Sequence, residues 1–194
     1  MSEIITFNSK SNKYWQLSNF YGGCEICYMK DRFENPEIKD LFDSFNTCTE
    51  EQFINYLKIF QPNKKWTEAK LNYWVKTTNK GNIPIRGILA KLIGTSVKNT
   101  PTGKQRQKII SNLLGLEKPI KIKKELNSDQ KKELMLQCLG TKFKDPYFKE
   151  ILLSTKNSVL HEKPMRGSGD NWTYPGGDWL GTLLMQIRDE INTN

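Results

Sequence analysis

The chain has 194 residues, 37% of them hydrophobic and 11% aromatic, so it is long enough for one domain with a buried core. Thirty basic residues against 21 acidic ones give a net charge of +9, which fits either an anionic partner or a solvated lysine-rich surface. No apolar run reaches membrane-spanning length and no basic-then-apolar leader opens the chain, so we expect a soluble cytoplasmic protein without a membrane partner.

The first third of the chain contains two short stretches with strand character and one clear helix. Residues Ile4–Asn8 and Cys24–Met29 are predicted to be strands. A helix is predicted to begin after Thr49, with Gln52 completing a capping box, and to end before Pro62. The acidic segment 31–46 has no decisive periodicity.

The middle of the chain predicts three more helices. The first follows Thr67 as its N-cap, and the second begins at Pro84 and ends before Gly94. A Pro/Gly-containing loop is then expected over residues 95–104. A short helix is predicted over residues 105–114 and is stopped by Gly115.

The last third predicts helices separated by one long loop. Residues 119–124 are expected to be extended, Ser128 is expected to cap a helix that reaches Phe143, and Asp145 followed by Pro146 is typical of a helix start. A final helix with an apolar stripe is predicted after Asp178 as its N-cap. Together these elements predict a mainly α (α+β) fold: a single compact helical domain over residues 1–194 with a small N-terminal β-sheet.

The loop over residues 161–181 is the strongest local signal of function. It combines five glycines with acids, an arginine, aromatic residues and His161, the only histidine of the chain. Long loops of this kind inside a compact domain usually bind ligands or carry catalysis. His161 itself is interpreted as a hydrogen-bonding residue of the loop.

Several familiar kinds of site are not indicated by the sequence. Cys24 and Cys27 form a C-x-x-C pair, but no second pair follows at zinc-ligand spacing, so no metal is expected. Gly167 and Gly169 lack the third glycine and the preceding strand of a dinucleotide-binding fingerprint, and the chain has no P-loop. We therefore expect no cofactor.

A co-linear set of short motifs resembles the NADAR family. The motifs are Ser18-Asn19-Phe20, Trp66-Thr67-Glu68, Met135, Lys142-Phe143, Leu152-Leu153-x-Thr155, Leu160-x-Glu162, Asp170-x-Trp172 and Gly177-x-x-Leu180-Gly181-x-Leu183-Leu184-Met185-x-x-Arg188. The resemblance covers nearly the whole chain except an expected insertion around residues 31–65. The chain departs from the family pattern near Asn127, where a Trp is missing, and at Asp178, which replaces an Asn.

The resemblance implies an N-glycosidase that acts on riboflavin-pathway intermediates or removes ADP-ribose from guanine. Such a reaction builds positive charge on the ribose, which a carboxylate stabilises while it takes a proton from water. The resemblance assigns this catalytic role to Glu68 and Asp170. Local sequence alone also allows an ordinary first-turn glutamate at position 68 and a turn-forming aspartate at position 170.

The resemblance also implies a set of substrate-binding residues. They are Asn19, Phe20, Lys142, Glu162, Arg166, Trp172 and Asp178. Trp172 is expected to stack on a base or to line the pocket, and Arg166 to clamp a phosphate. A turn asparagine, a core tryptophan and solvated surface cations are the structural alternatives.

Three functions remain open at this stage. The first is hydrolysis of a ribosyl–base or ribosyl–amine bond, with an ADP-ribosyl or phosphoribosyl substrate that is a free metabolite or part of modified DNA or RNA. The second is a non-catalytic ADP-ribose or nucleotide-binding module, and the third is a basic binder of single-stranded nucleic acid. The enzyme hypothesis predicts that Glu68, Asn19, Asp170 and Trp172 share one pocket.

Overall fold

The computed structural model describes residues 3–19, 21, 23–79, 85–97, 100–123, 125–164 and 170–193. The chain divides into two compact units: unit 1 consists of Met1–Cys24 and Leu126–Asn194, and unit 2 consists of Glu25–Glu125. Unit 2 is thus inserted in sequence between the two parts of unit 1, and the expected insertion at 31–65 falls inside it. The described elements are mostly helices with a two-stranded sheet, which confirms the mainly α (α+β) class.

The sheet of unit 1 joins two distant segments of the chain. Strand β1 (Ile4–Phe7) pairs in parallel with β2 (Val159–Glu162), with Ile4 opposite Val159 and Phe7 opposite Glu162. Alternate residues of both strands are buried, as expected for a sheet with one covered face. The prediction of a strand at Ile4–Asn8 is confirmed.

The prediction of a strand at Cys24–Met29 is wrong, because Cys24–Lys30 is helix α1. Cys24 and Tyr28, one helical turn apart, are both buried. A short apolar run does not distinguish a strand from a buried helix by its periodicity.

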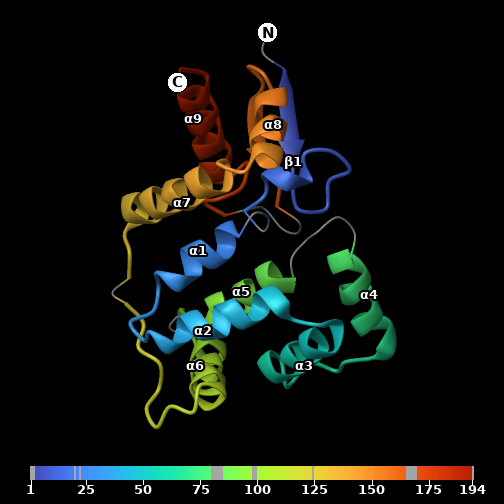
Figure 1. Cartoon of the computed structure of the whole chain (residues 1–194), viewed down its shortest axis with the longest axis vertical. Coiled ribbons are helices and arrows are strands. Elements are labelled where there is room, and N and C mark those ends of the chain that lie inside the picture. The colour runs from blue at the N-terminus through green and yellow to red at the C-terminus, as the bar shows by residue number, and fades with distance from the viewer. Residues whose placement is uncertain are drawn as a thin grey trace. The chain divides into compact units, whose positions relative to one another are not determined.

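The remaining elements of unit 1 are one 3-10 turn and three helices. They are η1 (Trp15–Leu17), α7 (Ser128–Lys142), α8 (Pro146–Ser154) and α9 (Trp179–Thr193). Helix α9 packs on β2 and also contacts α7 and α8 (Figure 1). Its buried face includes Leu180, Leu184 and Ile187, as the apolar stripe predicts.

The helix starts of unit 1 follow local capping rules. Asp145 accepts a hydrogen bond from the Tyr147 amide and is followed by Pro146 at the first helical position, as predicted. The cap of α7 is Asn127 and not Ser128 as expected, since Asn127 and Gln130 form a reciprocal capping box.

Unit 2 is helical. Its helices are α1, α2 (Glu37–Ser44), α3 (Glu50–Phe60), α4 (Glu68–Asn79), α5 (Ile85–Gly94) and α6 (Pro101–Leu113), with 3-10 turns η2 (Phe45–Thr47) and η3 (Thr95–Val97). Buried Phe42, Phe53 and Leu89 belong to its core. Phe33 and Ile122 form an antiparallel bridge, so the second segment is extended at that point, as predicted.

Three helix boundaries of unit 2 can be compared with the predictions. The capping box of Thr49 and Gln52 is confirmed. Helix α6 begins at Pro101 instead of Gln105, because Thr100 accepts a hydrogen bond from the Gly103 amide and Pro101 suits a first helical position. Gly94 is the last residue of α5, not the residue after it, and the predicted start of that helix at Pro84 lies outside the described residues.

No helix in the described parts of the chain is both long enough and apolar enough to cross a membrane.

Candidate functional site

A buried carboxylate lies at the end of β2 in unit 1. Glu162 is the last residue of that strand and falls on the buried face together with Leu160, so only 8% of its surface is exposed. The Ser18 hydroxyl, directly after η1, donates a hydrogen bond of 2.8 Å to Glu162 Oε1. A buried carboxylate is costly unless it is hydrogen-bonded, so this contact fixes the segment after η1 against β2.

A buried ammonium group holds the same segment from its other side. Lys142, the last residue of α7, is 2% exposed. Its Nζ donates to the carbonyl oxygens of Gln16, Leu17 and Ser18 at 2.6, 3.3 and 2.9 Å. An ammonium group has three protons, so all of them are used by the backbone and none is left for a phosphate.

Burial lowers the pKa of Lys142 from its ordinary value of 10.5 to about 8, against opposite effects of the nearby Cys24 and Glu162 groups. The two aromatic rings beneath it, Phe143 and Phe148, each lie 5.2 Å from Nζ. The side chain therefore positions the Gln16–Ser18 turn and, through it, the adjoining Asn19.

Asn19 follows this anchored turn. The residue is half-buried, and its side-chain amide makes no hydrogen bond to any described part of the chain. Its amide is thus a hydrogen-bond donor and acceptor that lies next to a buried network.

The described part of the glycine-rich loop begins with a turn built on Asp170. Its Oδ1 accepts hydrogen bonds from the Trp172 amide at 2.9 Å and from the Thr173 hydroxyl at 3.2 Å. Asp170 is exposed, and its Oδ2 accepts no hydrogen bond within the described residues. The local turn fixes one oxygen of the carboxylate.

The loop is tied to the end of the sheet and to α9. The Tyr174 amide donates to the Glu162 carbonyl at 2.8 Å. The rings of Trp172 and Trp179 meet edge to face with centroids 5.1 Å apart. The ring of Trp172 is therefore partly exposed and packs against Trp179 on one side.

A histidine–carboxylate pair contacts the loop at the end of β2 and the start of α9. His161 Nδ1 and Asp178 Oδ2 share a hydrogen bond of 2.7 Å, and the imidazole stacks on Tyr174 with centroids 4.2 Å apart. Asp178 directly precedes α9 in the sequence. The pair thus ties the start of α9 to β2. Asp178 is predicted to bind substrate, and in the structure its Oδ2 makes this hydrogen bond to His161.

The other predicted residues lie elsewhere or are not described. Phe20 and Arg166 fall outside the described residues. Glu68 is the first residue of α4 in unit 2; it is exposed, and its carboxylate has no described hydrogen-bond partner. The Thr67 hydroxyl accepts a 3.4 Å hydrogen bond from the Lys70 amide, consistent with the predicted helix start. A pocket that joins Glu68 to Asn19, Asp170 and Trp172 stays a prediction.

Sequence reasoning missed Ser18 as a partner of the site. The Ser18-Asn19-Phe20 motif predicts Asn19 and Phe20 as site residues, while Ser18 makes the hydrogen bond to Glu162. The partner is 144 positions away, so no local pattern reveals it. Arg188, the last residue of the final motif, is buried and donates to the Thr155 hydroxyl and the Ser158 carbonyl, both at 2.9 Å.

The residues gathered in unit 1 are one connected set of hydrogen-bonding groups with an aromatic wall. It joins Asn19, through Ser18, to Lys142 and Glu162, and joins Glu162, through Tyr174, to the loop. Within the described ranges no group of three or more His, Cys, Asp or Glu side chains could hold a metal ion. No protein-family model, curated protein or solved structure matches the chain.

Proposed function

We propose that the chain is an N-glycosidase that hydrolyses a ribosyl–base or ribosyl–amine bond, with ADP-ribose on a guanine base as the preferred substrate. The supporting observation is the network of unit 1, in which Asn19, Glu162 and the Asp170–Trp172 turn are tied together. These residues are among those that the resemblance to the NADAR family implies. A rigid network that holds open polar groups beside an aromatic wall suits a nucleotide-like ligand.

The proposed reaction breaks the bond between the ribose C1′ and the base nitrogen. The base leaves with the electron pair of that bond, positive charge grows on the ribose, and water adds to C1′. The Oδ2 of Asp170 offsets the developing charge, and Glu68 takes a proton from the water and returns it to the nitrogen of the departing base. Asn19 hydrogen-bonds the ribose or the base, and Trp172 lines the ring of the base.

A nucleotide-binding module is the second candidate. Glu68 and Asp170 are both exposed, and a carboxylate surrounded by water stabilises a nearby cation only weakly. This observation favours binding without turnover unless the bound substrate excludes water from the two groups. Glycosidase action on phosphorylated riboflavin-pathway intermediates is the alternative within the enzyme class.

Incubation with defined substrates separates these functions. The purified protein is mixed with DNA and RNA oligonucleotides that carry ADP-ribosylated guanine, and with a phosphoribosyl-aminopyrimidine, and the products are read by mass spectrometry. The proposal expects unmodified guanine and free ADP-ribose. The Asp170→Asn variant should lose this turnover, whereas Asp129→Asn, at an exposed position in the first turn of α7, should not.

Saturable binding of the modified oligonucleotide without product would instead establish the binding module. Turnover of the aminopyrimidine alone would instead identify a riboflavin-pathway intermediate as the substrate.

A further inference from the structure

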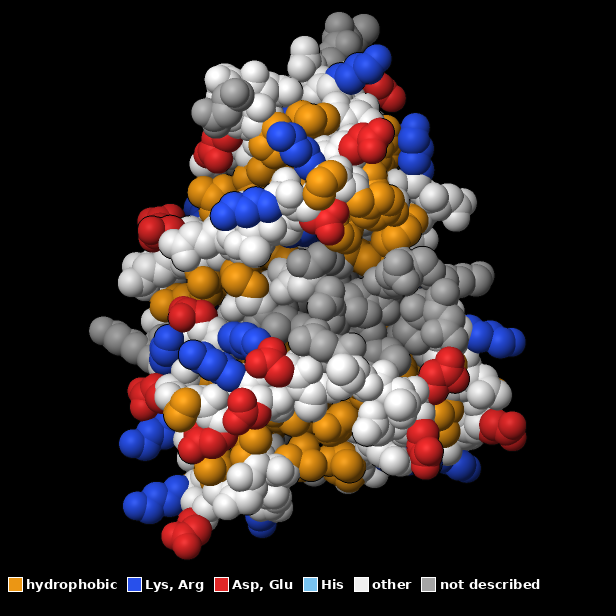
Figure 2. All heavy atoms as spheres, in the orientation of Figure 1, with side chains coloured by type: hydrophobic (Ala, Val, Ile, Leu, Met, Phe, Trp, Pro, Cys, Tyr) orange, Lys and Arg blue, Asp and Glu red, His pale blue; other side chains and the backbone are white. Residues whose placement is uncertain are grey.

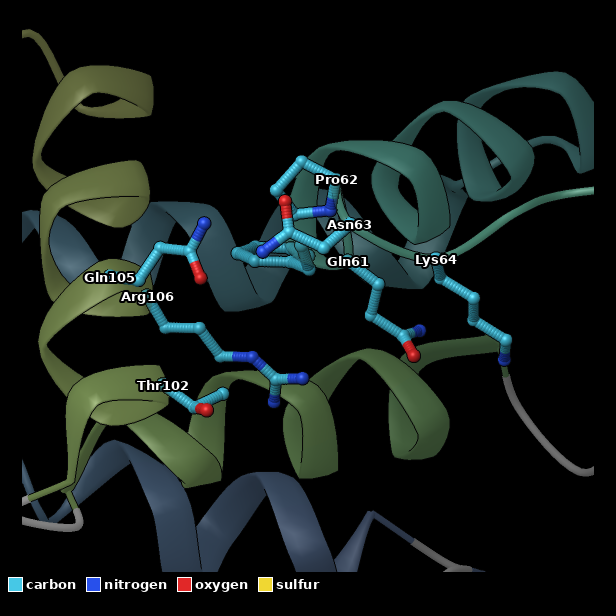
Figure 3. Close-up of a pocket in the computed structure, with 8 residues that line it drawn as sticks. Gln61, Pro62, Asn63, Lys64, Thr102, Gln105 and Arg106 are labelled. Atoms are coloured by element: carbon cyan, nitrogen blue, oxygen red, sulfur yellow. The ribbon is translucent and has the colours of Figure 1, made fainter.

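Unit 2 contains an open pocket that the glycosidase proposal does not use. It lies between the C-terminal end of α3 with the residues that follow it and the first half of α6, and its volume is about 300 Å³ (Figure 3). That volume is at the lower end of the range for small-molecule sites, about 300–1,000 Å³. The pocket is therefore large enough for a small ligand.

The polar side chains around the pocket can all donate hydrogen bonds, and two of them are cations. Amides come from Gln61, Asn63 and Gln105, and positive charges from Lys64 and Arg106. No Asp or Glu lines it. Figure 3 shows the Arg106 guanidinium reaching from α6 toward Gln61, with Asn63 and Thr102 on either side of it.

Arg106 has an unusual environment for a buried cation. Only 8% of the residue is exposed, and its Nη1 donates to the Leu92 carbonyl. Its Nε is buried without a hydrogen-bond partner, and no carboxylate of the described residues forms an ion pair with the guanidinium. A buried charge without a counter-ion is costly, and the cost is offset when an anion enters the site.

The backbone of α6 adds to the same preference. The helix has 13 residues, and its N-terminal end, capped by Thr100, lies beside the pocket through Thr102. The positive end of the helix dipole favours a negative group, although Pro101 has no amide proton and the Gly103 and Lys104 amides already donate to Thr100. Two features of α6, its N-terminus and Arg106 without a carboxylate partner in the described residues, thus point to the same kind of ligand.

We propose that this pocket binds the phosphate group of a small phosphomonoester. The planar guanidinium matches two oxygens of a phosphate, and the amide groups donate to the others. The pocket is wider than one phosphate needs, and the ring of Pro62 gives it an apolar side for the organic part of the ligand. The proposal stands independently of the glycosidase activity, since it concerns residues of unit 2 alone.

Calorimetric titration with adenosine monophosphate, inorganic phosphate and adenosine, at constant ionic strength, tests the proposal. The full chain should bind the monophosphate saturably, bind inorganic phosphate more weakly and not bind adenosine. Arg106→Gln should weaken monophosphate binding by about tenfold or more, because charge-assisted hydrogen bonds are lost. Lys108→Gln removes the same charge from an exposed position of α6 outside the pocket and should keep the affinity.

A second variant guards against a folding defect of Arg106→Gln. Gln105→Glu changes an exposed position of the pocket and supplies a carboxylate that can pair with Arg106, so it should fold and lose phosphate binding. Equal binding of phosphate and the monophosphate would overturn the organic part of the assignment. Adenosine binding as tight as the monophosphate, no saturable binding by the parent, or full affinity in both pocket variants would overturn the site itself.

Discussion

The ammonium group of Lys142 determines the position of the turn that carries Ser18 and Asn19. Its three protons satisfy three carbonyl oxygens at once, and the Ser18 hydroxyl then reaches Glu162. The ammonium group of this α7 residue thus adds side-chain hydrogen bonds to the backbone hydrogen bonds of the turn. The consequence is that one residue controls the geometry of a segment 124 to 126 positions earlier in the chain.

Lys142→Met should lower the free energy of unfolding by about 3 kcal/mol or more. Methionine fills a similar volume, but three buried carbonyl oxygens lose their donor, and each lost hydrogen bond costs about 1 kcal/mol. Chemical denaturation of parent and variant at pH 7 measures the difference. Lys149→Met, at an exposed position of α8, is the control and should change stability by less than about 0.5 kcal/mol.

The same lysine predicts a pH dependence of stability. Burial lowers the pKa of Lys142 to about 8 in the folded chain, whereas it is 10.5 when unperturbed. Between these pH values the unfolded chain binds more protons, so the free energy of unfolding rises with pH across this window, by about 3 kcal/mol in total. The difference in stability between the parent and Lys142→Met, measured from pH 7.5 to 10.5, isolates this contribution; a flat difference would contradict it.

Glu68 is the residue on which the proposed chemistry depends. Glu68→Gln should change the free energy of unfolding by less than about 1 kcal/mol, because both side chains fit an exposed first turn of a helix. Turnover should fall by about a hundredfold or more, since the amide neither accepts the proton nor carries a full negative charge. Ligand binding should survive.

Glu51→Gln is the matched control, an exposed first-turn glutamate of α3. It should turn over substrate like the parent. A Glu68→Gln variant with parental turnover would remove Glu68 from the mechanism and leave Asp170 as the group to examine.

At the scale of elements, the junction of α9 with β2 holds the loop of the site in place. Gly181 in the first turn of α9 lies against the Leu160 carbonyl, where an added Cβ would collide with backbone atoms. The His161–Asp178 hydrogen bond joins the same two elements. The close approach of helix and strand therefore requires glycine at this position.

Gly181→Ala should lower the free energy of unfolding by about 2–3 kcal/mol, because strand or helix must shift to accept a methyl group. Gly140→Ala in α7 is the control, since nothing lies within 4 Å of an added Cβ there. It should raise stability by up to about 1 kcal/mol through helix propensity. Thermal or chemical unfolding of both variants measures the contrast, and equal effects would contradict the close packing.

At the scale of the whole molecule, the chain carries a net charge of +9. On the face shown in Figure 2, Lys and Arg side chains alternate with Asp and Glu side chains and do not gather into one patch. A mixed surface of this kind steers anions by its net charge more than by a specific groove. The pattern gives little support to a dedicated nucleic-acid surface on that face.

The net charge nevertheless predicts how salt acts on a polyanionic substrate. The Kd for an ADP-ribosylated oligonucleotide should rise steeply as salt is raised from 50 to 200 mM, because phosphate contacts release counterions. The Kd for free ADP-ribose should rise much less, since it has few phosphates. Parallel titrations measure how the logarithm of each Kd depends on the logarithm of the salt concentration. Equal slopes would mean that the nucleotides around the modified base are not bound.

The sequence by itself determined the elements whose signals are local. Thr49 with Gln52, and Asp145 with Pro146, specify helix starts within four residues, and the stripe of α9 repeats at helical spacing, so these predictions agree with the structure. Motifs in the sequence predict Asn19, Glu162 and Trp172 as site residues. The hydrogen bond between Ser18 and Glu162 could not be predicted in this way.

Only the tertiary structure decided how distant segments pair. Residues 24–30 form a helix, against the prediction, because burial along one face outweighs strand propensity in a short apolar run. The pairing of β1 with β2, the Ser18–Glu162 hydrogen bond and the three carbonyl contacts of Lys142 join residues more than a hundred positions apart. Such contacts depend on how the whole chain closes around its core, and no pattern of neighbouring residues encodes them.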